Sequence, residues 1–79
     1  MKRLKEVVFL SKYRPEEKFT IELVESAVGI FHVREINDSG NVVDFTQHLR
    51  EGPAIRDFHR LIGETVMEGH SVSVARNDL

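Results

Sequence analysis

The chain of 79 residues contains no cysteine and no tryptophan, and it has only two prolines. The lack of cysteine excludes disulfide bonds, thiolate metal sites and catalysis by a thiol. The five glycines stand apart from one another, so the glycine-rich patterns that hold nucleotide phosphates are missing too. Whatever stabilises this chain must come from apolar packing, other polar contacts or a partner subunit.

Long apolar runs are absent as well. The longest is the four residues 7–10, far below the roughly 20 residues that span a bilayer and shorter than the core of a secretory signal. We therefore expect no membrane partner, and we predict a cytoplasmic protein. The lack of cysteine agrees with a reducing compartment.

Length and composition predict one soluble domain over residues 1–79. Hydrophobic residues make up 41% and charged residues 30% of the chain, as in ordinary globular proteins. A domain of this size typically buries only about 60% of the surface that its unfolded form exposes, so its stability is expected to be marginal. Since disulfides are excluded, self-association is the expected source of additional stability, and we predict a homodimer.

The first half of the chain has the pattern of β-strands. Phe19, Ile21 and Leu23 alternate with polar residues, which is typical of a strand with one buried face. The segment 37–41, with the sequence NDSGN, favours a hairpin turn. We place another turn at Glu25–Ser26 and interpret Gly29 as a bulge or a point of close approach. The predicted antiparallel strands cover residues 4–11, 18–24, 28–36 and 41–47.

The period changes after residue 50, where Gly52 and Pro53 favour the start of a helix. Gly69 suits the left-handed position that ends one. We predict a helix over residues 53–68 and a short fifth strand over 71–75. The fold class is therefore α+β, a four-stranded antiparallel meander packed against one C-terminal helix. The predicted core-facing side of that helix comprises Ala54, Ile55, Phe58, Leu61, Ile62, Thr65 and Val66.

The segment 57–70, with the sequence DFHRLIGETVMEGH, brings two histidines and two glutamates together in the sequence. On a helix, however, His59 and Glu64 project about 140° apart and cannot share a ligand. Glu64 and Glu68 share a face, where we expect both to be solvated. No nucleophile motif accompanies the serines, so we predict a non-enzymatic protein without a cofactor. A weaker alternative is a metal site assembled from His32, His48, His59 and His70.

Basic residues are concentrated at the start of the chain, where residues 1–18 carry a net charge of +3 against −5 for the remainder. Aromatic and cationic side chains together can bind single-stranded nucleic acid. A basic end can also pair with the acidic part of its own or a neighbouring subunit, and we favour this interpretation. The candidate nucleic-acid-binding residues are Lys2, Arg3, Lys5, Lys12, Tyr13 and Arg14.

Three helix residues form a candidate interface: His59, Gly63 and Met67. A glycine inside a helix costs on the order of 1 kcal/mol relative to alanine, which indicates either close approach of another backbone or simple tolerance. Met67 projects away from the core-facing side, where a flexible apolar side chain has no core to fill. The leading hypothesis is thus a small homodimeric regulatory module that acts through protein contacts, and single-stranded nucleic-acid binding is the alternative.

Overall fold

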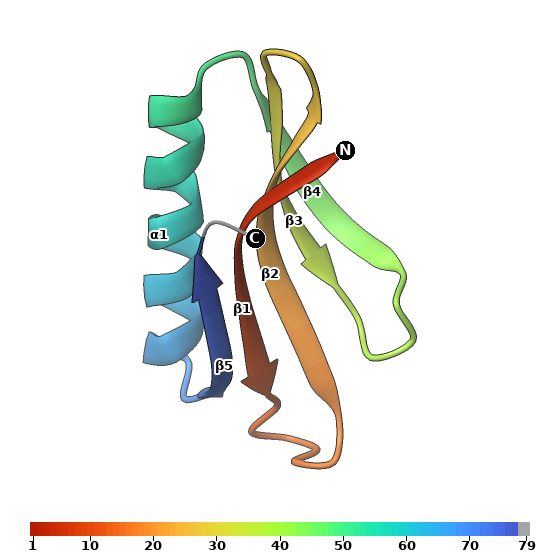
Figure 1. Cartoon of the computed structure of the whole chain (residues 1–79). Helices are drawn as coiled ribbons and strands as arrows, with labels where there is room; N and C mark the ends of the chain where they lie inside the picture. The colour runs from red at the N-terminus through yellow and green to blue at the C-terminus, as the bar shows by residue number, and fades with distance from the viewer. Residues whose placement is uncertain (78–79) are drawn as a thin grey trace.

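The computed structural model describes residues 1–77 of the chain. Within them, an antiparallel sheet packs against one helix, as Figure 1 shows, and this confirms the predicted α+β fold with its meander, its helix and its fifth strand. The helix is α1 (Glu51–Met67). The strands are β1 (Lys2–Leu10), β2 (Lys18–Ala27), β3 (Ile30–Ile36), β4 (Val42–His48) and β5 (Ser71–Asn77).

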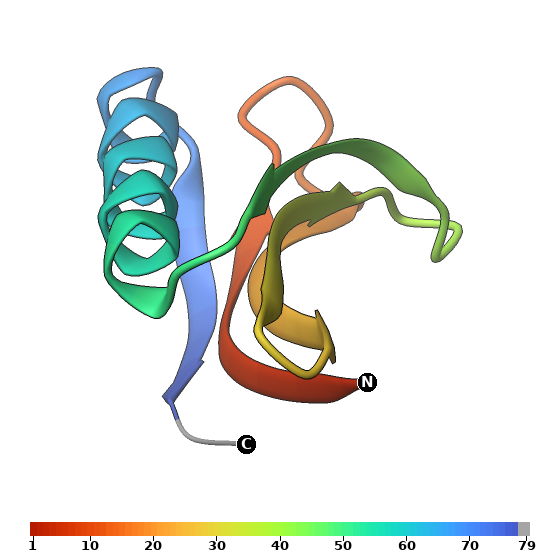
Figure 2. The same ribbon diagram turned by 90° about the horizontal axis from the view of Figure 1, so that it is seen from above.

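The order of strands in the sheet is β4-β3-β2-β1-β5, and every neighbouring pair is antiparallel. The chain builds β1 to β4 as successive neighbours. It then passes along α1 from the β4 edge to the opposite edge, where β5 joins β1. Figure 2 shows the strong curl of this sheet and the position of α1 beside it. The two edge strands, β4 and β5, are therefore furthest apart in the sheet.

The core lies between α1 and one face of the sheet. Phe58 and Ala54 of α1 are buried, and the helix packs against β2, β3 and β4. Phe9 and Phe19 stack with their ring centroids 5.3 Å apart. The sheet residues in this buried cluster are Val7, Phe9, Ile21, Leu23, Phe31 and Val33. They come from β1, β2 and β3, so the core is concentrated on the central strands.

The second hairpin differs from the prediction. We expected a turn at Glu25–Ser26 and a bulge at Gly29, but β2 continues to Ala27 and the turn is Val28–Gly29. The irregularity lies at Ser26 instead, because the pairing register shifts between Glu25 and Ala27. Gly29 has a φ of 76°, a conformation that glycine adopts without strain, which explains why the chain reverses there.

The helix begins two residues earlier than predicted, at Glu51, so Pro53 occupies its third position. Proline is tolerated there because the first four N–H groups of a helix have no partner within it. At the other end, Gly69 has a φ of 100° and donates its N–H to the carbonyl of Val66, as expected for a glycine cap. The prediction that Val66 faces the core is wrong, because Val66 is 48% exposed.

Candidate functional sites

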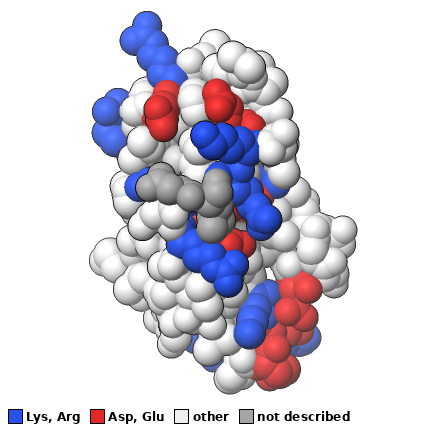
Figure 3. Space-filling view, viewed as in Figure 1, with Lys and Arg blue, Asp and Glu red and all other residues white. Residues whose placement is uncertain are grey.

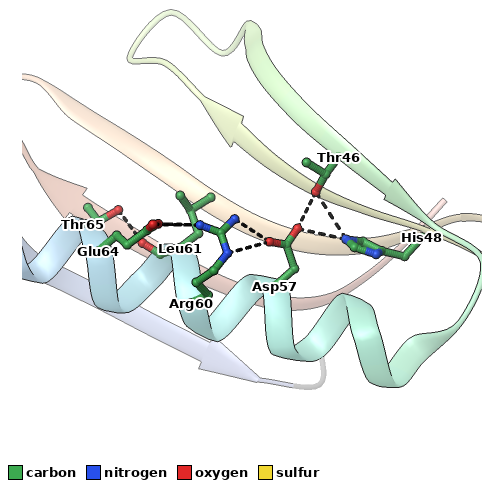
Figure 4. Close-up of polar contacts among 7 residues, drawn as sticks. All are labelled: Thr46, His48, Asp57, Arg60, Leu61, Glu64 and Thr65. Carbon is green, nitrogen blue, oxygen red and sulfur yellow. Dashed lines mark hydrogen bonds and ion pairs between the residues drawn. The ribbon is translucent and has the colours of Figure 1, made fainter.

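A polar cluster joins the middle of α1 to β4, and Figure 4 shows its members. The carboxylate of Asp57 accepts hydrogen bonds from the hydroxyl of Thr46 at 2.6 Å and from Nε2 of His48 at 2.9 Å. Arg60, one helical turn further on, donates to the other oxygen of Asp57 at 2.6 Å. The same guanidinium also binds Glu64, with a shortest N–O distance of 2.5 Å.

This environment shifts the ionisation of Asp57. Burial raises the pKa of Asp57, but the hydrogen bonds from Thr46, His48 and Arg60, together with the charge of Arg60, lower it to about 2. The carboxylate is consequently ionised at neutral pH and can only accept hydrogen bonds. Nε2 of His48 must then carry the proton that it shares with Asp57.

The cluster has the residue types of a hydroxyl–imidazole–carboxylate relay but not its order. In such a relay the imidazole lies between the hydroxyl and the carboxylate, so that it can take the hydroxyl proton. Here Thr46 and His48 both donate to Asp57, and the Thr46 hydroxyl is 3.5 Å from Nε2 of His48. The contacts therefore fasten α1 to β4, and they do not activate Thr46.

A second cluster, made of charged residues, lies on the face of the sheet that α1 does not cover. The strand registers align Arg76, Glu6, Glu22 and Arg34 across β5, β1, β2 and β3. Glu22 and Arg34 form an ion pair whose side chains are 6% and 18% exposed. The side chain of Glu6 is 11% exposed, with Arg76 at 3.5 Å and Arg3 at 3.8 Å, and its Oε2 atom accepts no well-formed hydrogen bond. The two adjacent glutamates are thus balanced by three arginines.

A surface groove of about 600 Å³ lies beside the second half of α1. The acidic residues that line this groove are Glu35, Glu64 and Glu68, and His70 lines it too. The His70 side chain is only 9% exposed, and its Nδ1 accepts the backbone N–H of Lys12 at 3.1 Å. The other residues that line the groove are Phe19, Leu61, Thr65 and Met67.

The structure separates the candidate nucleic-acid-binding residues into two groups. Lys2, Arg3 and Lys5 belong to the first half of β1, whereas Lys12, Tyr13 and Arg14 follow the end of that strand. A strand of nine residues is about 30 Å long, so the groups lie toward opposite ends of the sheet. Figure 3 likewise shows basic and acidic residues side by side on the face that it presents. The six residues do not gather into one basic patch.

Most of these cations have partners within the chain. Arg3 approaches Glu6, Arg14 binds Glu17 at 3.2 Å and Lys5 lies 3.4 Å from Nε2 of His59. Lys12 donates its side-chain amine to the backbone carbonyl of Glu68 and lies 5.0 Å from the centre of the Tyr13 ring. Tyr13 is 77% exposed and contacts His70 edge to face at 5.9 Å.

All three residues of the candidate interface lie on the exposed side of α1. Met67 is 89% exposed, and His59 is exposed next to Lys5. A Cβ atom added to Gly63 would meet nothing within 4 Å. No backbone in residues 1–77 therefore explains this glycine by close approach, and the choice between a partner chain and simple tolerance stays open.

The four histidines occupy separate places in residues 1–77. His32 pairs with Gln47 on the uncovered face, His48 binds Asp57, His59 lies near Lys5, and His70 packs against Phe19. Nowhere in this part of the chain do three or more histidine, aspartate or glutamate residues form a group that could bind a metal ion. In the same residues, no helix combines the length and apolar character needed to cross a membrane.

The residues with the closest polar contacts were not among the residues predicted from the sequence. Asp57, Arg60 and Glu64 follow the spacing of three and four that brings charges together on a helix, so this part was detectable. The contacts of Asp57 with Thr46 and His48 and the alignment of Glu22 with Arg34 depend on packing and strand register, which the sequence alone did not define.

In comparisons with known proteins, no family model, no curated protein and no solved structure matches this chain.

We expect Asp57→Asn to lower the free energy of unfolding at pH 7 by about 1–2 kcal/mol, after allowance for solvent screening. Because the folded-state pKa of about 2 lies below the ordinary 3.8, this stabilisation is present above pH 4 and is lost as the pH falls toward 2. About half of it should be gone at pH 3. Urea denaturation at pH 7 and pH 3 measures the difference.

Asp44→Asn, at an exposed position of β4, is the matched control and should change stability by less than about 0.5 kcal/mol at both pH values. An Asp57→Asn variant that tracks the wild type at every pH would show that the cluster does not stabilise the fold.

Proposed function

We propose that this protein is a non-enzymatic interaction module that works as a homodimer and acts through protein contacts. The observation that carries the proposal is the set of exposed apolar side chains on and beside the two open edges of the sheet. On β4 these are Val42, Val43 and Phe45, which are 45–53% exposed. Beside the other edge they are Val66, Val72 and Val74, with exposed fractions of 39–50%.

Single exposed apolar residues are normal in soluble proteins, but several together on one edge commonly accompany binding surfaces. Edge strands also present unpaired N–H and C=O groups to which another strand can bind. A small chain without disulfides gains stability when a partner covers such surfaces. The combination therefore favours association with another protein surface.

The polar groups support a binding role over a chemical one. Asp57, the group whose pKa is shifted most clearly, has its oxygens occupied by Thr46, His48 and Arg60. Its acceptor positions are directed toward its own fold, whereas a catalytic acid or base needs access to substrate. Glu22 is similarly engaged by Arg34, and its side chain is only 6% exposed.

Sedimentation equilibrium from about 5 to 500 µM should give a mass that rises toward twice the monomer mass of 9.1 kDa. Because a partner that binds only the folded chain stabilises it by mass action, the thermal midpoint should rise over the same concentration range. A constant 9.1 kDa mass with an unchanging midpoint contradicts the proposal.

The alternative of single-stranded nucleic-acid binding has one contact in its favour, the exposed Tyr13 ring with the Lys12 amine 5.0 Å from its centre. Such a pair could stack a base and attract its phosphate. Against it stand the division of the basic residues into two groups and the engagement of Arg3 and Arg14 with glutamates. We therefore keep protein contact as the leading function.

Fluorescence anisotropy with a labelled oligothymidine and a labelled oligouridine distinguishes the two. The leading proposal expects no saturable binding even at about 20 mM salt, where contacts to phosphate are strongest. Saturable binding that weakens steeply with added salt, and that Tyr13→Ala together with Lys12→Ala abolishes, would establish the alternative instead.

A further inference from the structure

We infer that the homodimer forms through β5, which pairs antiparallel with the β5 strand of a second copy while the second half of α1 flanks the junction. This inference rests on the proposed homodimer and identifies its interface. The occupant of the surface is another molecule of the same chain, and the two-fold axis passes next to β5.

β5 is the least supported element of the sheet. All seven of its residues are exposed, whereas β1, its neighbour, contains the buried Val7 and Phe9. The extensive helix packing involves β2, β3 and β4. β5 is therefore attached mainly through its pairing with β1 and through the ion pair between Arg76 and Glu6. A second strand on its open side would supply the missing neighbour.

The surface around β5 is compatible with its own copy because it carries little charge. In Figure 3 the region over the second half of α1 and β5 is almost free of coloured residues, while charges crowd the regions around it. The exposed uncharged residues available there are Val66 of α1 and Ser71, Val72, Ser73 and Ala75 of β5. A neutral surface can face an identical one without like-charge repulsion.

The pattern of charges along β5 suits antiparallel self-pairing. If all seven residues pair, the axis passes near Val74 and Arg76 lies opposite Val72 of the other copy. The two arginines are then not directly opposed, so a destabilising like-charge pair is avoided. Gly63, which no other backbone within residues 1–77 approaches, would allow the second copy to come close to α1.

The opposite edge is less suited to this role. Both edge strands have an irregularity, because the register of β4 shifts at Val43 and that of β5 shifts at Ser73. A bulge bends an edge but leaves hydrogen-bonding groups on it. Each edge strand also carries one charged residue, but Arg76 of β5 is engaged by Glu6 of its own sheet at 3.5 Å. Asp44 of β4 has no ion-pair partner among residues 1–77, and such a charge on an edge opposes pairing with another chain.

The size of the surface predicts a weak dimer. Seven strand residues span about 23 Å, and one sheet layer with its helix is about 20 Å deep, which gives roughly 500 Å² per copy. Specific interfaces commonly bury about 800 Å² per partner, so this one lies at the small end. We expect a dissociation constant of about 1–100 µM.

The test compares two lysine substitutions at equally exposed valines. Val72 on β5 is 50% exposed and Val43 on β4 is 51% exposed. Val72→Lys places two like charges at the inferred junction and should weaken dimerisation at least about 10-fold in sedimentation equilibrium. Val43→Lys should leave the dissociation constant within about 2-fold of the wild type.

Cross-linking provides an independent measurement if Val72→Lys fails to fold. The natural chain has no cysteine, so Ser73→Cys introduces a unique thiol beside the expected axis. A short bismaleimide should join two Ser73→Cys chains at concentrations where the wild type dimerises, and it should not join Ser39→Cys chains, whose thiol lies in the β3–β4 turn.

The outcomes separate the two proposals. A wild type that stays monomeric up to about 500 µM overturns the homodimer and the interface together, since even a 100 µM complex would be visible there. A dimeric wild type that resists Val72→Lys, or that yields no Ser73→Cys cross-link, overturns the β5 interface alone. Loss of the dimer with Val43→Lys and not with Val72→Lys would assign it to β4.

Discussion

The packing of Phe58 and Ala54 against the inner face of the sheet is the contact on which the rest of the structure depends. Both residues are buried, with exposed fractions of 2% and 0%, and they share one cluster with Phe9, Ile21 and Leu23. Burial of one phenylalanine side chain contributes about 1.5–3 kcal/mol, a large fraction of the stability available to so small a domain. The Asp57 cluster orients the helix in this contact, because it fastens the first half of α1 to β4.

The same packing determines which surfaces are left open. One helix cannot cover five curled strands, and α1 packs chiefly on β2, β3 and β4. On the sheet face away from α1, Arg34 pairs with Glu22, and Arg3 and Arg76 lie near Glu6. These charged side chains shield part of that face from solvent. β5 receives no such cover, and all seven of its residues stay exposed. The proposed association follows from this uneven distribution of burial.

The sequence predicted the elements well because each has its own periodicity: alternation in Phe19, Ile21 and Leu23 and helical spacing around Phe58. The errors occur where two explanations compete for one residue. Gly29 fits a bulge as well as a turn, and its φ of 76° shows the turn. Val66 lies at the margin of the apolar side of the helix. Whether a residue there is buried depends on how far the sheet extends beneath it. The contacts of Asp57 with β4 depend on how the helix packs on the sheet. The alignment of Glu6 with Glu22 depends on strand register, which local patterns do not specify.

The central claim is that the chain's own core secures the central strands and α1 but stops short of β5. Amide hydrogen exchange followed by NMR at about 10 and 500 µM tests it residue by residue. The account predicts slow exchange in β2 and β3 at both concentrations, and fast exchange in residues 71–77 that slows at the higher one. Protection of β5 that equals that of β2 and does not change with concentration would contradict the claim.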